Sequence, residues 1–226
     1  MSVLLCIETA TKNCSIALWD GEQMVASRAE RGDRFIHGER LHVLIKELLE
    51  EHSVDFNALN GICVGKGPGS YTGLRIGVST AKGLCFASGI PLYSVPTLGC
   101  FDFSNCTTPF VITVLDARRD EVYAQVWRLG EDGLSPDGAV EAVIITDDSW
   151  EYLHNEQVTV VGEGVEKMDQ FMTRIPENWQ LQANSDPDAK YMGQHLTVLP
   201  EAEDVAYFEP YYLKDFVAEK SKKKFF

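Results

Sequence analysis

The stretch GKGPGSYTGLRIGVSTAKGLCFASGIPLYSVPTL, residues 65–98, decides the fold of this chain. It opens with three glycines around Pro68, a composition that disfavours a helix and favours a tight, exposed turn. The apolar residues 61–64 before it predict a short buried strand, and residues 72–88 after it carry a helical apolar period without proline. The sequence therefore predicts a strand, a glycine turn and a helix.

Small residues recur at every fourth position of this predicted helix, namely Gly73, Gly77, Ala81, Cys85 and Gly89. An interior glycine costs about 1 kcal/mol relative to alanine in a helix. Such a ridge therefore predicts a close backbone approach to another element. That element is either the chain's own sheet or a second subunit, and both hold if the helix uses opposite faces.

The glycine turn does not match the standard phosphate-binding fingerprints. In GxGxxG starting at Gly65, the third glycine falls on Ser70, and Lys66 precedes the turn instead of opening the helix as in a Walker loop. Backbone N–H groups at a helix N-terminus do suit an anion. A phosphate site at this turn thus rests on geometry alone.

Composition and charge limit the classes of function. The 226 residues are 45% hydrophobic and 24% charged, which is typical of a globular protein with a sizeable core. The apolar runs are shorter than the roughly 18 residues of a membrane span, and the N-terminus lacks the features of a signal peptide, so we expect a cytoplasmic protein. The net charge of −14 disfavours binding of nucleic acid by the chain alone. The Lys-rich residues 220–226 are either a solvated end or a contact to RNA within a complex.

Cysteine and histidine positions do not predict a metal site. Six cysteines are scattered without a CxxC pair, which indicates buried reduced thiols. Residues 37–52 predict an amphipathic helix with Leu41 in its apolar stripe. Its histidines His37 and His42 are five positions apart, whereas a zinc-binding HExxH pair needs four. We expect His37 to be solvated or to lie in an interface.

The pattern of strand, polar turn and strand occurs twice. Residues 3–9 and 14–19 flank the first polar turn, and residues 110–115 and 121–129 flank the second. This suggests duplication of one α/β unit, as in actin-like folds. The remaining predictions are strands at 23–30, 92–95, 140–145 and 158–161, turns at 131–133 and 135–138, and helices at 97–103, 146–154, from 165 toward 174, and at 187–199.

Six segments together resemble the TsaB family, also called YeaZ: IETATKNCSIALW (7–19), HGERLHVLIKELL (37–49), the block 65–98, LDARRDEVYAQVW (115–127), VVGEGV (160–165) and EPYYLKD (209–215). The resemblance implies a two-lobed α/β fold of the actin-like (ASKHA, RNase H-like) type, each lobe a mixed β-sheet flanked by helices. The N-terminal lobe would comprise residues 1–105 and carry the dimerisation helices. The C-terminal lobe would comprise residues 106–226 with the basic tail.

The resemblance also implies a function without catalysis by this chain. Proteins of this family act in threonylcarbamoylation of adenosine 37 in tRNAs that read ANN codons. They bind and activate a TsaD-like transferase, a TsaE-like ATPase joins the assembly, and alone they form homodimers. The chain would contact tRNA only within the complex and would not bind a membrane. No cofactor is required of this chain, and weak binding of ATP or ADP at the subunit interface stays open.

The expected partner surface lies on the two helices of the first lobe. Its candidate residues are His37, Leu41, Gly73, Arg75, Gly77, Thr80, Ala81 and Leu84. Remnants of phosphate-binding loops are expected at Thr9, Thr11, Ser15, Gly67, Gly69, Ser70 and Arg118. Neither a catalytic residue nor a metal ligand is expected, since the chain lacks an HxxxH pair and carries Glu163 in the glycine loop of the second lobe. The rival interpretations are a stand-alone nucleotide-binding protein and a glycoprotease-like peptidase.

Overall fold

The first sheet contains the N-terminal meander and two parallel strands. The computed structural model describes residues 3–131, 133–196 and 199–214. Its five-stranded sheet has the order β3-β2-β1-β4-β5, with bounds β1 Val3–Glu8, β2 Asn13–Asp20, β3 Gln23–Arg31, β4 Gly61–Gly65 and β5 Leu92–Val95. β1 and β2 are antiparallel, and β4 pairs in parallel with β1 and β5. Because β1 is central, residues that follow it lie near the middle of the sheet edge.

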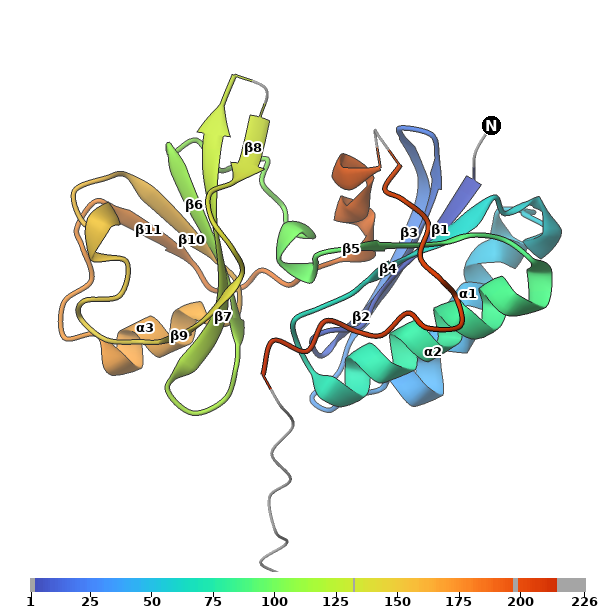
Figure 1. The fold of residues 1–226 in the computed structure, drawn as a ribbon, viewed down its shortest axis with the longest axis horizontal. Coiled ribbons are helices and arrows are strands. Elements are labelled where there is room, and N and C mark those ends of the chain that lie inside the picture. Colours follow the sequence, from blue (N-terminus) through green and yellow to red (C-terminus); the bar gives the residue numbers. More distant parts are fainter. Residues whose placement is uncertain (1–2, 132, 197–198, 215–226) are drawn as a thin grey trace, which may run out of the picture.

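Two helices cover one face of this sheet and a short helix covers the other. α1 (His37–Glu51) and α2 (Tyr71–Ser88) bury their apolar stripes in one core with the sheet. On the opposite face, the 3-10 helix η4 (Ala189–His195) packs with residues of β1 and β4. Figure 1 shows this short helix, in orange-red, on the side of the sheet away from α1 and α2. Ser70 caps the start of α2, where its side chain accepts a hydrogen bond from the N–H of Gly73, and Gly89 in the left-handed region caps its end.

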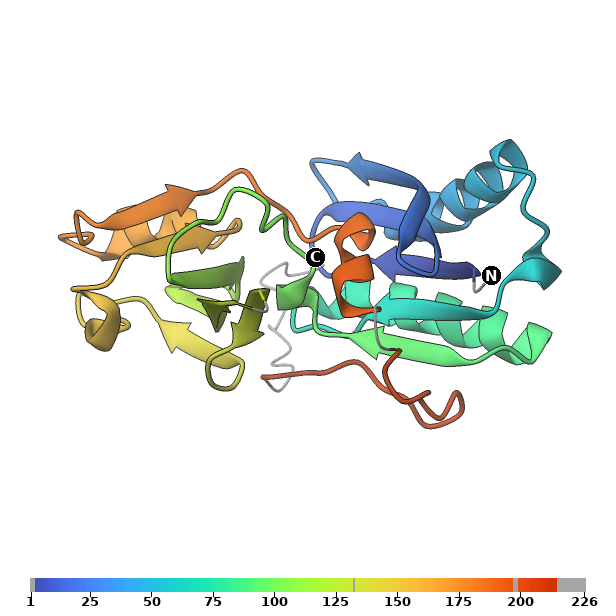
Figure 2. The same cartoon turned by 90° about the horizontal axis from the view of Figure 1, so that it is seen from above.

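The second sheet repeats the hairpin beside a parallel strand. Its order is β11-β10-β6-β7-β8, with bounds β6 Phe110–Asp116, β7 Glu121–Gly130, β8 Gly133–Pro136, β10 Val158–Val161 and β11 Trp179–Gln182. β9 (Glu141–Ile144) pairs with the first half of β7, and α3 (Val165–Phe171) contributes to the core of this sheet. Figure 2 shows the two sheets side by side. Two mixed sheets flanked by helices confirm the predicted α/β fold class.

Several predicted elements differ from the structure. Residues 146–154 do not form the predicted helix, because Trp150 has a φ of 52° and only the 3-10 turn η3 (Glu151–Leu153) follows. The helix predicted at 97–103 is limited to η2 (Thr97–Gly99). The helix predicted at 187–199 is η4, and residues 197–198 lie outside the described residues. Strands β8 and β11 were not predicted, and β8 overlaps both predicted turns, 131–133 and 135–138.

The chain crosses between the sheets and then returns to the first one. Residue 105, the predicted lobe boundary, lies in the connection between β5 and β6, and the division into domains at that residue stays a prediction. After β11 the chain passes back to η4 on the first sheet. We call residues 203–214 the strap: the N–H of Glu203 donates to Leu92 O at 2.8 Å, and Lys214 forms an ion pair with Glu121. In Figure 1 the strap crosses α2 toward the second sheet. The Lys-rich tail lies outside the described residues.

Candidate functional site

The small-residue ridge of α2 packs against the turn between β1 and β2 of the same chain. A Cβ on Gly73 would overlap the carbonyl oxygen of Thr9, and a Cβ on Gly77 would overlap its hydroxyl. Thr9 is buried, and its hydroxyl donates to Gly73 O at 2.9 Å. Ala81 has no exposed surface. The sequence left open whether the ridge approaches the chain's own sheet or a second subunit. Gly73 and Gly77 approach the chain's own first lobe.

The glycine turn before α2 is shaped around the same short segment, residues 8–10. A Cβ on Gly65 would overlap the Glu8 carboxylate, and a Cβ on Gly69 would lie 2.6 Å from the Cβ of Ala10. The N–H of Ser70 donates to Ala10 O at 2.7 Å. Glycines at 65, 69, 73 and 77 therefore all make room for residues 8–10. This is the physical reason for their spacing.

The carboxyl group of Glu8 is enclosed within this segment. Glu8 is 0% exposed, and its Oε1 accepts hydrogen bonds from the N–H groups of Thr9 at 2.8 Å and Ala10 at 2.7 Å. Its Oε2 accepts a hydrogen bond from the Thr97 hydroxyl at 3.0 Å. Burial raises the pKa of Glu8 to about 7, although these three hydrogen bonds favour the charged form. Glu8 falls in the predicted strand at residues 3–9, and the sequence carried no signal of these hydrogen-bond partners.

The other predicted loop residues of the first lobe also have partners inside the chain. The hydroxyl of Thr11 accepts a hydrogen bond from Asn13 N at 3.2 Å, and that of Ser15 accepts one from Ala189 N at 3.0 Å. Gly67 has a φ of 104° and donates its N–H to the Thr97 hydroxyl at 3.1 Å. The structure thus brings these residues together, but around internal contacts. Their assignment as phosphate-loop remnants stays a prediction.

Arg118 lies apart from that group, in the turn between β6 and β7. It is exposed and has a φ of 69°, and its N–H donates to the Asp116 carboxylate at 2.6 Å. Asp116 also forms an ion pair with Lys167 at 2.6 Å, and Lys167 Nζ donates to Glu121 O at the same distance. The turn is therefore held by internal ion pairs and hydrogen bonds, with the Arg118 side chain at the surface.

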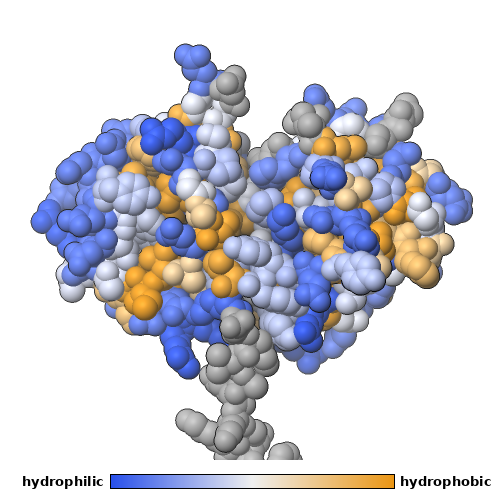
Figure 3. Space-filling model, in the orientation of Figure 1, coloured by the Kyte–Doolittle hydropathy of each residue, from blue (hydrophilic) through white to orange (hydrophobic). Residues whose placement is uncertain are grey.

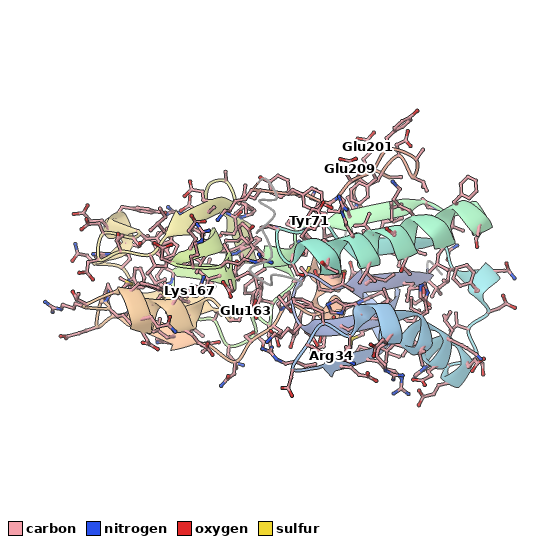
Figure 4. All side chains as sticks on the ribbon, turned by 90° about the horizontal axis from the view of Figure 1, so that it is seen from below. Arg34, Tyr71, Glu163, Lys167, Glu201 and Glu209 are labelled. Carbon is pink, nitrogen blue, oxygen red and sulfur yellow. The ribbon has the colours of Figure 1, made fainter. Side chains whose placement is uncertain are left out.

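Glu163 stands in the glycine loop of the second lobe, which lies close against β6. A Cβ on Gly162 would overlap Val114 O, so this loop carries its first side chain at Glu163. Glu163 is half-buried, and burial together with the nearby Asp116 carboxylate raises its pKa above the ordinary value, against the effect of Arg31. Figure 4 shows Glu163 on the side of the second lobe that faces the first. A carboxylate at this position opposes the approach of a phosphate.

His37 is not solvated, which was one of its two expected positions, and its place in an interface stays a prediction. It is 0% exposed, and one of its ring nitrogens, Nε2, lies 2.7 Å from Thr11 O. Burial lowers the pKa of His37, which favours the neutral ring. The expectation of a solvated histidine was wrong because the helix period shows which residues share a face, whereas the contact to Thr11 comes from tertiary structure.

The remaining candidate partner residues are divided between the core and the surface. Leu41 is 0% exposed and Thr80 is 7% exposed, so neither offers surface to a partner in this conformation. Leu84 is half-buried and Arg75 is exposed. Binding of a partner by any of them stays a prediction, and only Arg75 and Leu84 are accessible enough to contact one directly.

The outer face of α2 carries residues that the sequence analysis did not select. Phe86 is 85% exposed, and a Cβ on Gly83 would meet no atom within 4 Å. Ser79, one turn before Gly83, is also exposed, and Val43 of α1 is 37% exposed. The sequence signal that could have identified this exposed face is Phe86, a large apolar side chain outside the buried apolar stripe of α2. Apolar residues also reach the surface over α3 and β9 (Figure 3), where Phe171 and Ile144 are exposed.

The strap is attached to α2 by a lysine. Lys82 Nζ donates to Ala206 O at 3.1 Å and to Phe208 O at 2.7 Å, and Phe208 packs against the core of the first sheet. Tyr207, which lies between these two residues, is 84% exposed. Figure 4 shows Glu201, which precedes the strap, and Glu209 within it on the outer side of α2.

Arg75 holds the strap nearer the start of α2. Its Nε donates to the Tyr212 hydroxyl at 3.2 Å, and its guanidinium lies 4.1 Å from the centre of the Tyr71 ring. The Tyr71 and Tyr212 rings are 5.1 Å apart. The exposed Arg75 therefore has a structural role within the chain.

Among residues 3–131, 133–196 and 199–214, no group of three or more His, Cys, Asp or Glu residues could hold a metal ion. No described helix is long and apolar enough to cross a membrane.

Comparison with known proteins gives the family. A family model described as TsaD, tRNA N6-adenosine threonylcarbamoyltransferase, matches residues 35–224. The tRNA threonylcarbamoyladenosine biosynthesis protein TsaB of Escherichia coli (strain K12) is 33% identical over 165 residues, which cover 70% of each chain. TsaB of Haemophilus influenzae is 30% identical over 182 residues, covering 74% of this chain and 75% of that one. This chain belongs to the TsaB family.

Solved structures extend the likeness to TsaB over nearly the whole chain. YeaZ from Pseudomonas aeruginosa has a TM-score of 0.78 at 26% identity and covers 94% of this chain and 100% of its own. A second structure from the same organism, described as an uncharacterized protein with similarity to peptidase YEAZ, has a TM-score of 0.79 at 27% identity, with 95% and 100% covered. Membership of the TsaB (YeaZ) family, expected from the sequence motifs, is confirmed.

Proposed function

We propose that this chain is a non-catalytic partner subunit in the threonylcarbamoylation of adenosine 37 of tRNAs that read ANN codons. It binds and activates a TsaD-like transferase, a TsaE-like ATPase joins the assembly, and tRNA is contacted only within the complex in the cytoplasm. The observation that carries the proposal is the 30–33% identity with TsaB proteins that are named for threonylcarbamoyladenosine biosynthesis. The match to the TsaD family model supports a partner of similar fold.

Carboxyl groups in the first loop and in the glycine loop support a subunit that does not itself catalyse a reaction. The buried carboxyl group of Glu8 accepts the N–H groups of the first loop, and Glu163 places a second carboxyl group in the glycine loop. Both carboxyl groups stand where a nucleotide-dependent enzyme of this fold class would need room for phosphate. No cofactor is therefore assigned to this chain, and nucleotide at a subunit interface stays part of the proposal.

We place the partner surface on the exposed side of α1 and α2. The buried ridge of Gly73, Gly77 and Ala81 gives α2 its position, and the outward residues Gly83 and Phe86 then face solvent. An exposed aromatic side chain beside a glycine with open space suits a tightly packed partner helix, because hot spots of interfaces are enriched in aromatic anchors. The same surface serves either the TsaD-like subunit or a second copy of this chain.

The test is co-purification with the TsaD-like protein of the same genome, followed by light scattering and an assay of tRNA threonylcarbamoylation. We expect a discrete heteromer, and activity only when both proteins are combined. Phe86→Asp should weaken the complex by tenfold or more, in the range of about 1.4 kcal/mol or above. The matched control is Tyr152→Asp in the second lobe, where Tyr152 is 68% exposed.

Two results would contradict the proposal. A chain that stays alone beside the TsaD-like protein and hydrolyses ATP or a peptide would support one of the rival enzyme interpretations. An intact complex with Phe86→Asp would leave the function standing and would move the partner surface elsewhere.

A further inference from the structure

Glu8 ends β1 at the point where an actin-like fold makes its first loop. The carboxyl group is 0% exposed and is bound by the two N–H groups that follow it, those of Thr9 and Ala10. Two successive N–H groups that converge on one oxygen are the arrangement by which backbone loops bind anions. The ligand of this loop is thus already present, and it is a side chain of the same chain.

The surroundings of Glu8 are built to hold this ligand. Gly65 on the neighbouring strand leaves the room that the carboxyl group occupies, because a Cβ there would overlap it. The Thr97 hydroxyl donates to the second carboxyl oxygen and accepts a hydrogen bond from Gly67 N at 3.1 Å. Both carboxyl oxygens are therefore engaged, one by the loop and one by the residue at which the chain leaves the first sheet.

We infer that the first loop is a carboxyl-binding site that the chain fills with Glu8, and that Glu8 thereby excludes a nucleotide phosphate from this loop. The inference concerns contacts within the chain and does not rest on the proposed function. It also leaves open a nucleotide at a subunit interface, since that site would lie elsewhere.

Opposing effects act on the charge of the Glu8 carboxyl group. Burial raises the pKa of Glu8 to about 7, and the nearby Asp188 carboxylate acts in the same direction. The thiol of Cys100 also faces Glu8, and its own pKa is raised mainly by burial and further by Glu8. The hydrogen bonds from Thr9, Ala10 and Thr97 act in the other direction and favour the charged carboxylate. Glu8 therefore excludes a phosphate because it occupies the donors of the loop.

Chemical rescue tests whether Glu8 is the ligand. In Glu8→Ala the loop N–H groups lose their partner, and a small carboxylate can replace it. With formate at ten times its Kd, we expect the Tm of Glu8→Ala to rise by about 3–5 °C, saturably. Sodium chloride at the same concentration should not produce this rise. Leu48→Ala is the matched control, because Leu48 is 0% exposed in the apolar core and its loss leaves a cavity without N–H donors.

Absence of a formate-specific rise in folded Glu8→Ala would overturn the inference, as would an equal rise in Leu48→Ala or in the wild-type protein. NMR keeps the inference falsifiable if Glu8→Ala does not fold. In the wild-type protein the amide resonances of Thr9 and Ala10 should titrate together near pH 7, and Glu8→Gln should abolish this titration. Millimolar Mg-ATP should leave both amides unmoved in the wild-type protein. A saturable shift of these amides with Mg-ATP would contradict exclusion of phosphate.

Discussion

A side chain on Gly77 would occupy the place of the Thr9 hydroxyl, because α2 crosses the β1–β2 turn with almost no space between the two backbones. Thr9 cannot easily move away, since its hydroxyl donates to Gly73 O and the residue is buried. The glycine block of this family thus positions a loop, and the helix propensity lost at Gly77 is offset by this close packing.

Gly77→Ala should therefore destabilise the protein although alanine is the better helix former. Overpacking of a close contact costs about 1–3 kcal/mol, which exceeds the gain of about 1 kcal/mol in helix propensity. The matched change is Gly83→Ala in the same helix, where a Cβ meets no atom within 4 Å. We expect Gly83→Ala to stabilise the protein by about 0.5–1 kcal/mol. Urea unfolding measures both, and equal signs for the two variants would contradict this account.

Glu8 should make stability depend on pH near neutrality. Its pKa is raised from the ordinary value of 4.5 to about 7, so the folded state holds the proton more tightly than the unfolded state. The stability that this proton contributes is fully present below about pH 4.5 and is lost as pH rises through 7. Glu8→Gln keeps the shape of the side chain but cannot titrate. Relative to Glu8→Gln, the wild-type protein should lose up to about 3 kcal/mol between these pH values.

The comparison must be made as a difference, because His37 acts in the opposite direction. Burial lowers the pKa of His37, so its stabilising neutral form is lost as pH falls below the ordinary value of 6.5. Subtracting the unfolding free energies of the wild-type protein and Glu8→Gln at each pH removes this contribution. A difference that does not change with pH would show that Glu8 has an ordinary pKa.

Lys82→Met should release part of the strap. The ammonium group donates to two carbonyl oxygens, those of Ala206 and Phe208, and the substitution removes both hydrogen bonds while keeping the apolar stem. We expect a loss of about 1–2 kcal/mol and faster proteolysis at residues 206–208. Lys46→Met is the control, because Lys46 is 73% exposed and is paired with Glu50 at 3.7 Å on the surface. Equal proteolysis of the two variants would show that Lys82 does not hold the strap.

The six cysteines should be unreactive in the folded protein. All of them are buried thiols, and burial raises the pKa of Cys14 to about 12 and those of Cys85 and Cys106 to about 11. Because the thiolate is the reactive form, labelling with a thiol reagent should follow global unfolding. The measurement is the labelling rate against urea concentration. Rapid labelling of any cysteine without denaturant would contradict this burial.

The long elements were predictable from the sequence because their signals are local. α1 and α2 each repeat an apolar period over several turns, and Ser70 and Gly89 mark the ends of α2. The helix predicted at 146–154 does not form because Trp150 has a left-handed backbone, which the apolar pattern does not reveal. Strand β8 (GLSP) was missed because three of its four residues favour turns, and β11 (WQLQ) because half of its residues are polar glutamines.

The site was less predictable because its contacts join distant segments. The spacing of Gly73 and Gly77 showed that a close neighbour exists, but the period of a helix does not name that neighbour. It proved to be Thr9, more than sixty positions earlier in the chain. His37 and Glu8 likewise take their burial from residues elsewhere in the sequence, so their residue types alone did not predict it.

η4 has a consequence for the order in which the protein is made. All strands of the first sheet have been synthesised by residue 95, yet one face of that sheet is covered only when Ala189 and Met192 arrive. A nascent chain that ends between these points exposes Leu4 and its apolar neighbours to solvent. The N-terminal half therefore emerges from the ribosome with an exposed apolar surface. Chaperones bind surfaces of this kind until, here, the C-terminal residues cover it.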